Sequence, residues 1–414
     1  MAEVPDEAAP ASGLSAARPA LIRTMNEQLL LEYIRTAGPY SRADLARVSG
    51  LSKPTVSLAL ANLDRAGLVR LAGQRTGMPG RSALLYEVRP EAGFVLGLDI
   101  GLRYVRGAVA DLTGVVRARA SREVGSSGSA VQDRIGELVR LAEDLCAQAG
   151  ITLASVTQTV VGSPGVYDRR RDVITLTGGL PGLDRPEALA CLRDAFGPRL
   201  AIENDVDAAA LAERALGHGR DIDNFAFVHV GTGIGMGLVL EGKLHRGVHG
   251  VAGEIAFMPL GDVIMAWDGT QESGGRVDLE EARRRGPLET AAAADGVVRA
   301  ARRAGMTGPV TARSVFEAAA KGDAGAAAVV AAEAEIVAAA ICCVITVADP
   351  SLVVLGGGIG QAPGFAGAVA SALGGMTPVM PDLKVSALGT EVVVDGCLAE
   401  GTALAWNQLI AAMP

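Results

Sequence analysis

The stretch Ser41–Leu63, SRADLARVSGLSKPTVSLALANL, has the apolar spacing of two short helices joined by a turn. A first helix is predicted over Arg42–Val48, and Gly50 allows the turn after it a positive φ. Ser52 is placed to cap a second helix, and Pro54 suits its first turn. Apolar residues then recur at the i, i+4 and i+7 positions that pack a helix onto its neighbours: Val56, Leu60 and Leu63. The stretch therefore predicts a helix-turn-helix.

The segments on both sides extend this pattern to a winged helix. Asn26–Arg35 predicts an amphipathic helix that packs through Leu29, Leu30, Tyr33 and Ile34. The segment from Gly67 to Val88 predicts a hairpin with strands LVRL and ALLYEV around the loop QRTGMPGRS. Arg75 and Arg81 lie on this wing. Similar spacing also arises by chance in helical proteins, and that alternative stays open.

The second helix of such a motif enters the major groove of DNA with its N-terminal end. Small hydroxyl side chains and one lysine at that end suit close contact with base edges and phosphates. The residues expected to contact DNA are Arg42, Ser52, Lys53, Pro54, Thr55, Ser57, Arg75 and Arg81.

Charge is divided unevenly along the chain. The whole chain carries −8, which by itself argues against nucleic acid. Residues 18–90, however, contain 11 basic and 5 acidic residues, so they carry +6 and leave −14 for the rest. A basic segment on an acidic protein is typical of a DNA-binding domain, although a solvated basic face is the alternative reading.

Length and composition divide the 414 residues into four parts. Residues 1–20 are rich in Ala, Pro and Ser and are expected to be disordered. Residues 21–90 form the predicted winged helix, and the remainder is long enough for two further lobes, 91–206 with 398–414 and 207–397. No charge-free apolar run reaches the length of a membrane span and no signal peptide is evident, so we expect a cytoplasmic protein without a membrane partner.

The cysteines and histidines do not form a metal-binding pattern. Three of the five cysteines are isolated, and Cys342 and Cys343 are adjacent on an Ala-rich segment. His245 and His249 are four residues apart but have no neighbouring cysteine or helical pattern. We therefore expect no metal and no cofactor.

Glycine turns and acidic residues follow predicted strands through the rest of the chain. DIG at 99–101 lies between two strand-like stretches, END at 203–205 ends a strand before a helix, and GTGIG at 231–235 joins two strands. AGEI follows at 252–255, and GGG at 356–358 ends a buried strand. A single turn of this kind is a weak signal, but the order of the whole set is informative.

This order resembles the ROK family of repressors, open reading frames and sugar kinases, from about Thr24 to the end of the chain. The resemblance implies an α/β body of two actin-like lobes behind an N-terminal winged helix. It implies that Asp205 stands where the kinases have their general base, and that Asn204 and Glu254 stand at sugar-contacting positions. The positions that match phosphate-binding turns are Asp99, Gly101, Gly231, Thr232, Gly233, Gly235 and Gly357.

Several departures from the kinase pattern bear on activity. Phe257 stands where the kinases have a histidine, and their zinc-binding cysteine cluster has no counterpart between Cys191 and Cys342. Leu102 places a bulky side chain in the first phosphate turn, and Gly179 replaces an asparagine of the sugar site. Asp205 is then at most a vestige of the general base, and the three retained polar residues could equally be structural.

The sequence therefore predicts a transcriptional regulator of repressor type without kinase activity, acting in carbohydrate metabolism. A homodimer or homotetramer would bind a partly palindromic operator in double-stranded DNA. A sugar or sugar phosphate at Asn204, Asp205 and Glu254 would modulate it. Two alternatives stay open: a sugar kinase that also binds DNA, and a regulator that answers to no small molecule.

Overall fold

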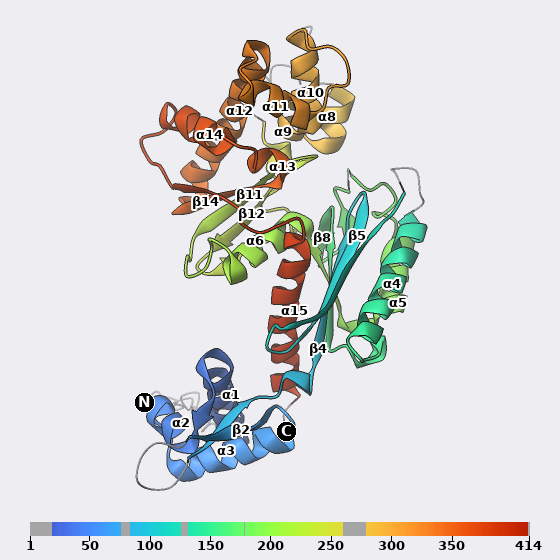
Figure 1. The fold of residues 1–414 in the computed structure, drawn as a ribbon. Helices are drawn as coiled ribbons and strands as arrows, with labels where there is room; N and C mark the ends of the chain where they lie inside the picture. The colour runs from blue at the N-terminus through green and yellow to red at the C-terminus, as the bar shows by residue number, and fades with distance from the viewer. Residues whose placement is uncertain (1–18, 76–82, 126–130, 178, 260–278, 413–414) are drawn as a thin grey trace, which may run out of the picture. The chain divides into compact units, whose positions relative to one another are not determined.

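The computed structural model describes residues 19–75, 83–125, 131–177, 179–259 and 279–412 (Figure 1). The chain divides into two compact units. The first, here called the head, runs to Ala92 and also takes in the segment from Trp406; the second, the body, runs from Gly93 to Ala405. The C-terminal segment that was predicted to belong to one lobe, residues 398–414, is thus divided between the units.

The head consists of three helices and a small antiparallel sheet. The helices are α1 (Pro19–Ala37), α2 (Arg42–Ser49) and α3 (Lys53–Arg65), and the strands are β1 (Tyr40–Ser41), β2 (Val69–Arg75) and β3 (Ala83–Val88), in the order β1-β3-β2. Two helices joined by a turn and two hairpin strands are present where the sequence predicts them, but β2 continues through Gln74 and Arg75, which were predicted to lie in the loop. The wing loop and Arg81 lie outside the described residues, as do residues 1–18.

Local signals set the ends of the two short helices. Ser41 and Asp44 form a capping box at the start of α2, in which the Ser41 hydroxyl accepts from the Asp44 backbone N–H. Gly50 ends α2 at φ 71°, and Ser52 caps α3 by accepting from the backbone N–H of Thr55. These are the roles that the sequence predicts for Gly50 and Ser52.

The core of the head draws on all three helices. Its buried residues include Leu30, Leu31, Ile34, Leu45, Val56, Leu60 and Leu63. The prediction for Leu29 is wrong, because its side chain is 39% exposed and Leu31 is buried in its place. Helix α1 is longer than the predicted segment. It packs directly against α3, and this contact buries Leu31 in place of Leu29.

The first lobe of the body is a five-stranded sheet with helices on both faces. Its strands are β4 (Phe94–Ile100), β5 (Tyr104–Asp111), β6 (Val116–Glu123), β7 (Gln158–Ser163) and β10 (Leu200–Asn204), in the order β10-β7-β4-β5-β6. Helices α4 (Val131–Gln148) and α5 (Pro186–Phe196) share a hydrophobic core with one face. The predicted three-strand meander is confirmed as β4, β5 and β6.

Helix α15 (Val392–Ala411) crosses the other face at glycines of the strands. A Cβ on Gly97 would lie 2.9 Å from the carbonyl oxygen of Val394, and one on Gly162 would lie 2.4 Å from the Val393 side chain. The absence of side chains at these two positions lets the helix pack directly on the sheet.

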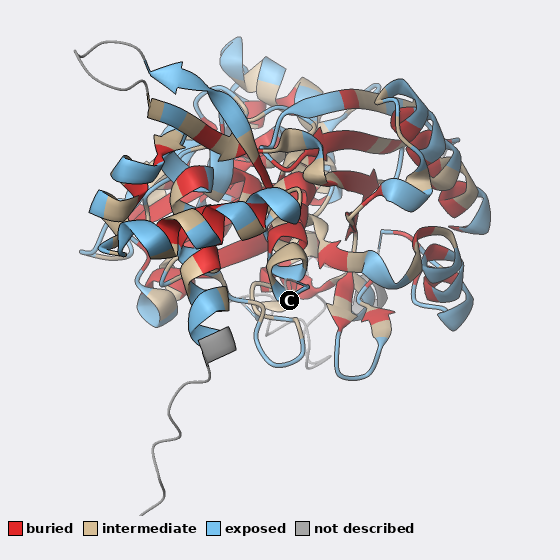
Figure 2. Ribbon diagram, turned by 90° about the horizontal axis from the view of Figure 1, so that it is seen from below, coloured by how far each residue is buried: buried red, intermediate tan, exposed pale blue. Residues whose placement is uncertain are grey.

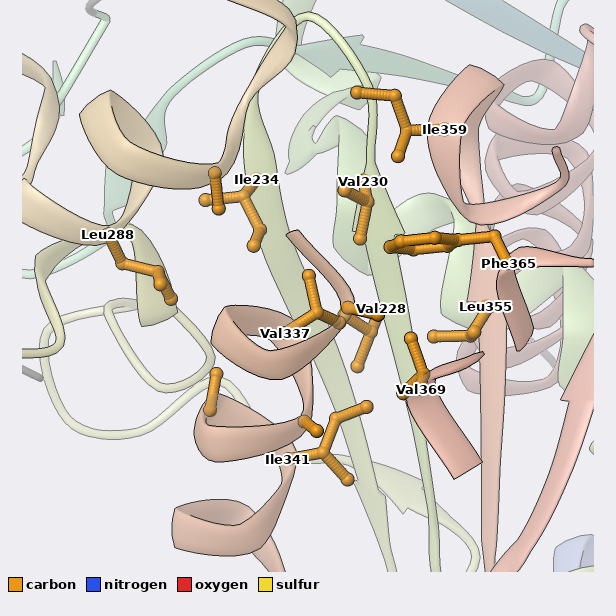
Figure 3. Close-up of a cluster of buried hydrophobic side chains, with 14 of the residues drawn as sticks. Val228, Val230, Ile234, Leu288, Val337, Ile341, Leu355, Ile359, Phe365 and Val369 are labelled. Atoms are coloured by element: carbon orange, nitrogen blue, oxygen red, sulfur yellow. The ribbon is translucent and has the colours of Figure 1, made fainter. Parts of the chain in front are cut away.

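The second lobe is also a five-stranded sheet between helices. Its strands are β11 (Phe225–Val230), β12 (Ile234–Leu240), β13 (Lys243–Leu244), β14 (Leu352–Gly356) and β15 (Asp382–Val385), in the order β13-β12-β11-β14-β15. Alternate residues of β11 face opposite ways: Val228 and Val230 point into the core drawn in Figure 3, and Phe225 and Phe227 pack against α6 (Asp205–Leu216).

The helices of that core are α12 (Ala324–Ala348) and α14 (Phe365–Gly374), with α9 (Pro287–Ala292), α10 (Ala294–Arg303) and α11 (Ala312–Ala320) beside them. Further α-helices and strands in the described part of the body are α8 (Leu279–Arg285), α13 (Gly357–Gly360), β8 (Val166–Asp168) and β9 (Val173–Thr175). Figure 2 shows the helices with buried and exposed residues on opposite sides, as amphipathic helices have.

Helix α12 is, among the described residues, the one helix long and apolar enough to cross a membrane. Half of its most apolar window is buried inside the protein, and its side chains Val337 and Ile341 face the sheet in Figure 3. It therefore acts here as the central core helix of the second lobe.

Candidate DNA-binding and effector sites

The N-terminal end of α3 carries the polar residues predicted to meet DNA. Lys53 and Pro54 are exposed, and Thr55 and Ser57 are partly exposed. The hydroxyls of Ser52 and Thr55 lie 2.8 Å apart and share a hydrogen bond, and Ser52 also caps the helix. Lys53 and Ser57 are thus the residues of this group for which the structure shows no internal role.

The arginines of the head are held by neighbouring side chains. Arg42 lies 5.3 Å from the ring centre of Tyr86 and donates to its hydroxyl at 2.5 Å. Arg75, on the wing strand, donates to the Asp44 carboxylate at 3.1 Å, and Arg47 lies 3.6 Å from the same group. Asp44 therefore joins the wing strand to α2, a role that its sequence position alone did not indicate.

In the body, the strands of the first sheet end together. Strands β4, β7 and β10 are parallel, and their register places Asp99 beside Gly162 and Gly162 beside Glu203. Asn204 follows at the end of β10, and Asp205 begins α6. Because the carboxyl ends of parallel strands meet at one edge of a sheet, the predicted residues Asp99, Asn204 and Asp205 come together there.

Both the oxygen and the nitrogen of the Asn204 amide form hydrogen bonds with the protein backbone. Its Oδ1 accepts from the backbone N–H groups of Val206, at 2.8 Å, and Asp207, at 3.1 Å, which caps α6. Its Nδ2 donates to the carbonyl of Gly165 at 3.2 Å. The structure thus gives Asn204 a structural role in addition to any contact with a ligand.

Three carboxyl groups near these strand ends hold their protons more tightly than usual. Burial, with a smaller contribution from Asp99, raises the pKa of Asp205 to about 7. Burial and the nearby Glu289 raise the pKa of Glu254 to about 7. Burial raises the pKa of Asp99 to about 6 although the Arg106 guanidinium, 2.9 Å away, opposes the shift. At neutral pH this cluster is partly protonated and can both donate and accept hydrogen bonds.

An ion-pair network that the sequence analysis missed lies beside this cluster. Nε of Arg246 donates to both carboxylate oxygens of Glu203, and the shorter of these hydrogen bonds is 2.9 Å. Nη2 of Arg246 donates to Glu400 at 2.9 Å. It links a loop of the second lobe to a strand end and to α15 of the first. No local pattern indicates this contact, because its members are far apart in the sequence.

The first glycine turn contacts the segment around Gly179. The Leu102 side chain lies over Gly179, where a Cβ would be 3.5 Å from Cδ1. Arg134, which is buried, donates to the carbonyls of Gly101 at 2.9 Å and Leu102 at 2.6 Å. The two departures from the kinase pattern at Leu102 and Gly179 are therefore one packing contact.

The other two glycine turns lie side by side on the second sheet. His229 pairs in register with Gly235 on one side and Gly356 on the other. Burial lowers the pKa of His229 to about 4, so its ring is neutral. Gly357 has φ 79°, and a Cβ there would lie 2.4 Å from the carbonyl oxygen of Val230. The tight approach of the two turns requires a glycine at this position.

The residues present do not match the zinc site of the family's kinases. Phe257 packs against the apolar core of the second lobe. Within the described ranges, His, Cys, Asp and Glu nowhere form a group of three or more that could hold a metal ion. The five cysteines are free thiols.

The chain is similar in sequence to a protein named as a repressor and to a bifunctional enzyme. The xylose repressor of Bacillus subtilis (strain 168) is 27% identical over 240 residues, or 58% of this chain and 61% of the repressor. The bifunctional enzyme NanE/NanK of Brucella suis biovar 1 is 34% identical over 241 residues, or 55% of this chain and 42% of that enzyme. The chain thus spans about six tenths or less of these curated relatives.

Solved structures share the fold. A ROK hexokinase from Thermus thermophilus superimposes with a TM-score of 0.62 at 29% identity, over 76% of this chain and 99% of the hexokinase. A ROK family transcriptional regulator, described as a homologue of the E. coli MLC protein, gives a TM-score of 0.73 at 23% identity over 94% of this chain and all of its own. The family model for ROK proteins matches residues 95–389, and the chain belongs to the ROK family.

Proposed function

We propose that this protein is a DNA-binding transcriptional repressor that acts in the cytoplasm as a homo-oligomer. The observation that carries the proposal is the helix-turn-helix of the head, with Lys53 and Ser57 at the free N-terminal end of α3 on a segment of charge +6. Relatives named xylose repressors support the same function.

The proposed mechanism follows from the two-fold symmetry of such repressors. Two heads at a fixed spacing contact successive major grooves of a partly palindromic operator, with the start of α3 reading bases and the wing contacting the DNA backbone or minor groove. A sugar or sugar phosphate bound near Asp205 and Glu254 shifts the body between two states and changes that spacing. A preference of a few kcal/mol for one state is sufficient.

The test is the capture and sequencing of genomic fragments by the purified full-length protein at near-physiological salt. The capture is run with no additive, with xylose, and with a mixed sugar and sugar-phosphate pool. A two-fold-symmetric site that is released by sugar supports the whole proposal, and a site indifferent to every addition supports an effector-independent regulator. The absence of an enriched site contradicts DNA recognition by the head.

A sugar kinase is the second candidate function. It is favoured by the position of Asp205 at the start of α6, with a pKa of about 7 that suits a general base, and by the likeness to a ROK hexokinase. Sugar-dependent release of ADP from ATP that is lost in Asp205→Asn would establish it. We expect no such turnover, because the bulky Leu102 stands in the first phosphate turn, where the family's kinases have small or hydroxyl residues.

A further inference from the structure

Helix α1 of the head has a second apolar face besides the one that packs in the core. Leu30, Leu31 and Ile34 are buried in the core of the head. On the opposite side of the helix, at 3.6 residues per turn, lie four apolar side chains that are 39–57% exposed: Leu21, Ile22, Met25 and Leu29. We call these four residues the α1 stripe.

The spacing of the α1 stripe is symmetric about Met25. Leu21, Met25 and Leu29 follow one another at intervals of four residues, so they lie along one side of the helix over about 12 Å. When two copies of this helix cross antiparallel about a two-fold axis at Met25, Leu21 of each copy faces Leu29 of the other. The stripe is therefore complementary to itself.

The charge of α1 favours a protein as its partner over DNA. The helix contains two basic residues, Arg23 and Arg35, and two acidic ones, Glu27 and Glu32, so its net charge is zero in a segment of charge +6. Glu32 and Arg35 also pair with each other at 2.6 Å. The positive charge that phosphates require thus lies on other elements of the head.

The chain's own N-terminal segment is poorly suited to cover the stripe. The large apolar side chains of residues 1–18 are Met1, Val4 and Leu14, and no two of these are four residues apart. Two prolines lie between the first and the last of them, which disfavours a helix that could lie along the stripe. A second copy of α1 offers the matching pattern that this segment lacks.

We propose that the α1 stripe binds the α1 stripe of a second copy of this chain, so that two heads pair antiparallel through α1. Eight half-exposed side chains form a contact smaller than the ~1,200 Å² at which stable interfaces begin. The pairing therefore acts where contacts between bodies already hold two copies together, because at such an effective concentration a weak contact is sufficient. Since α3 packs on α1, the pairing fixes the distance between two recognition helices. The inference rests on the proposed function, from which it takes the homo-oligomer.

Disulfide cross-linking of the full-length protein tests the pairing without DNA. In a Cys191→Ser background, which removes the exposed native thiol, Met25→Cys places a thiol on the two-fold axis. Mild oxidation should link two copies at least about tenfold faster than in Leu58→Cys, the control, whose site on α3 is 54% exposed. Leu21→Cys should link as slowly as the control, because its two copies would lie about 12 Å apart along antiparallel helices, beyond the reach of a disulfide.

Three results would overturn the proposal. They are linking of Met25→Cys no faster than that of Leu58→Cys, linking of Leu21→Cys as fast as that of Met25→Cys, and linking of Met25→Cys only after removal of residues 2–18. The last would assign the stripe to the chain's own N-terminal segment. Sedimentation equilibrium and operator capture with the unchanged protein test the proposed function separately, so a dimer that captures an operator but does not link through residue 25 contradicts the α1 pairing alone.

Operator binding supplies the second readout. Met25→Lys places two like charges at the axis, and it should lower affinity for an operator with two half-sites by at least about tenfold while affinity for a single half-site is unchanged. Lys is chosen because a further positive charge would otherwise favour DNA. Met25→Leu keeps the apolar contact and should bind like the unchanged protein. An equal loss on both kinds of site in Met25→Lys would contradict the pairing.

Discussion

The head and the body place their candidate functional groups in opposite environments. In the head these groups lie on the surface of one short helix whose ends are set by neighbouring residues, such as Ser52 and Gly50. In the body the candidates are largely buried carboxyl groups whose pKa values depend on one another, as for Asp205 and Asp99. The comparison teaches that residues in the head should act almost independently, whereas those in the body should act as a coupled set.

The largest expected effect comes from breaking the core of the head alone. Leu60→Ala removes a fully buried side chain of α3 and should cost about 2–5 kcal/mol of the head's stability. Binding to DNA should fall with it, while the body should melt as before. Differential scanning calorimetry of the full-length protein measures both units. Leu58→Ala, 54% exposed on the same helix, is the control, and an equal loss of stability in the two variants would contradict the described core.

Substitutions at the start of α3 should separate affinity from specificity. Thr55→Ala or Ser57→Ala should relax sequence preference by about 1–3 kcal/mol, because base contacts carry the discrimination. Lys53→Ala should instead weaken binding to all DNA and lower the slope of affinity against salt by about 1. Competition binding over a salt series measures both quantities, with Lys321→Ala, an exposed residue directly after α11, as the control. If all three head variants bind like the parent, α3 is not the recognition helix.

The coupled carboxyl groups of the body should make its stability fall as pH rises. The folded protein holds protons on Asp205 and Glu254 up to about pH 7, whereas the unfolded chain releases them near pH 4. The two groups therefore contribute most to the stability of the folded state below about pH 4. This contribution is lost as the pH rises to about 7. Asp205→Asn and Glu254→Gln should each stabilise the body at pH 8, by on the order of 1 kcal/mol, and flatten its melting temperature between pH 5 and 8.

The opposite sign is expected at Asp172. The Arg193 guanidinium and the Tyr167 hydroxyl lower the pKa of Asp172 to about 2, so this carboxylate favours the folded state at neutral pH. Asp172→Asn should therefore leave the slope between pH 5 and 8 unchanged and lower stability slightly. A steeper fall of stability with pH in Asp205→Asn than in the parent would contradict the raised pKa of Asp205.

The smallest expected effect is that of metal removal. Neither unit, over the described ranges, contains a cluster with the composition of a metal site. An excess of EDTA should therefore leave the melting temperatures of both units unchanged. The measurement is a thermal melt before and after dialysis against the chelator, and a clear fall for the body would mean that metal ligands were overlooked.

The sequence predicted the elements that depend on neighbouring residues and missed contacts that depend on register and tertiary packing. The caps at Ser52 and Gly50 and the glycine turns were found because each signal lies within a few residues. The pairing of Arg106 with Asp99 is a cross-strand contact, which becomes visible only when the register of β4 and β5 is known. Arg246 contacts Glu203 across 43 residues, so no local pattern could have indicated this pair.

The amide of Asn204 limits what can replace it. Ser, Thr or Asp could cap α6 in its place. The side chains of Ser and Thr are too short to reach the carbonyl of Gly165 as well. The Asp carboxylate has no hydrogen to donate to that carbonyl, because both groups are acceptors. Gln has the right groups on a side chain that is one methylene too long for the cap. The strand end therefore selects Asn whether or not a sugar ever binds there, and an Asn retained at this position in a relative is no evidence that the relative has a sugar pocket.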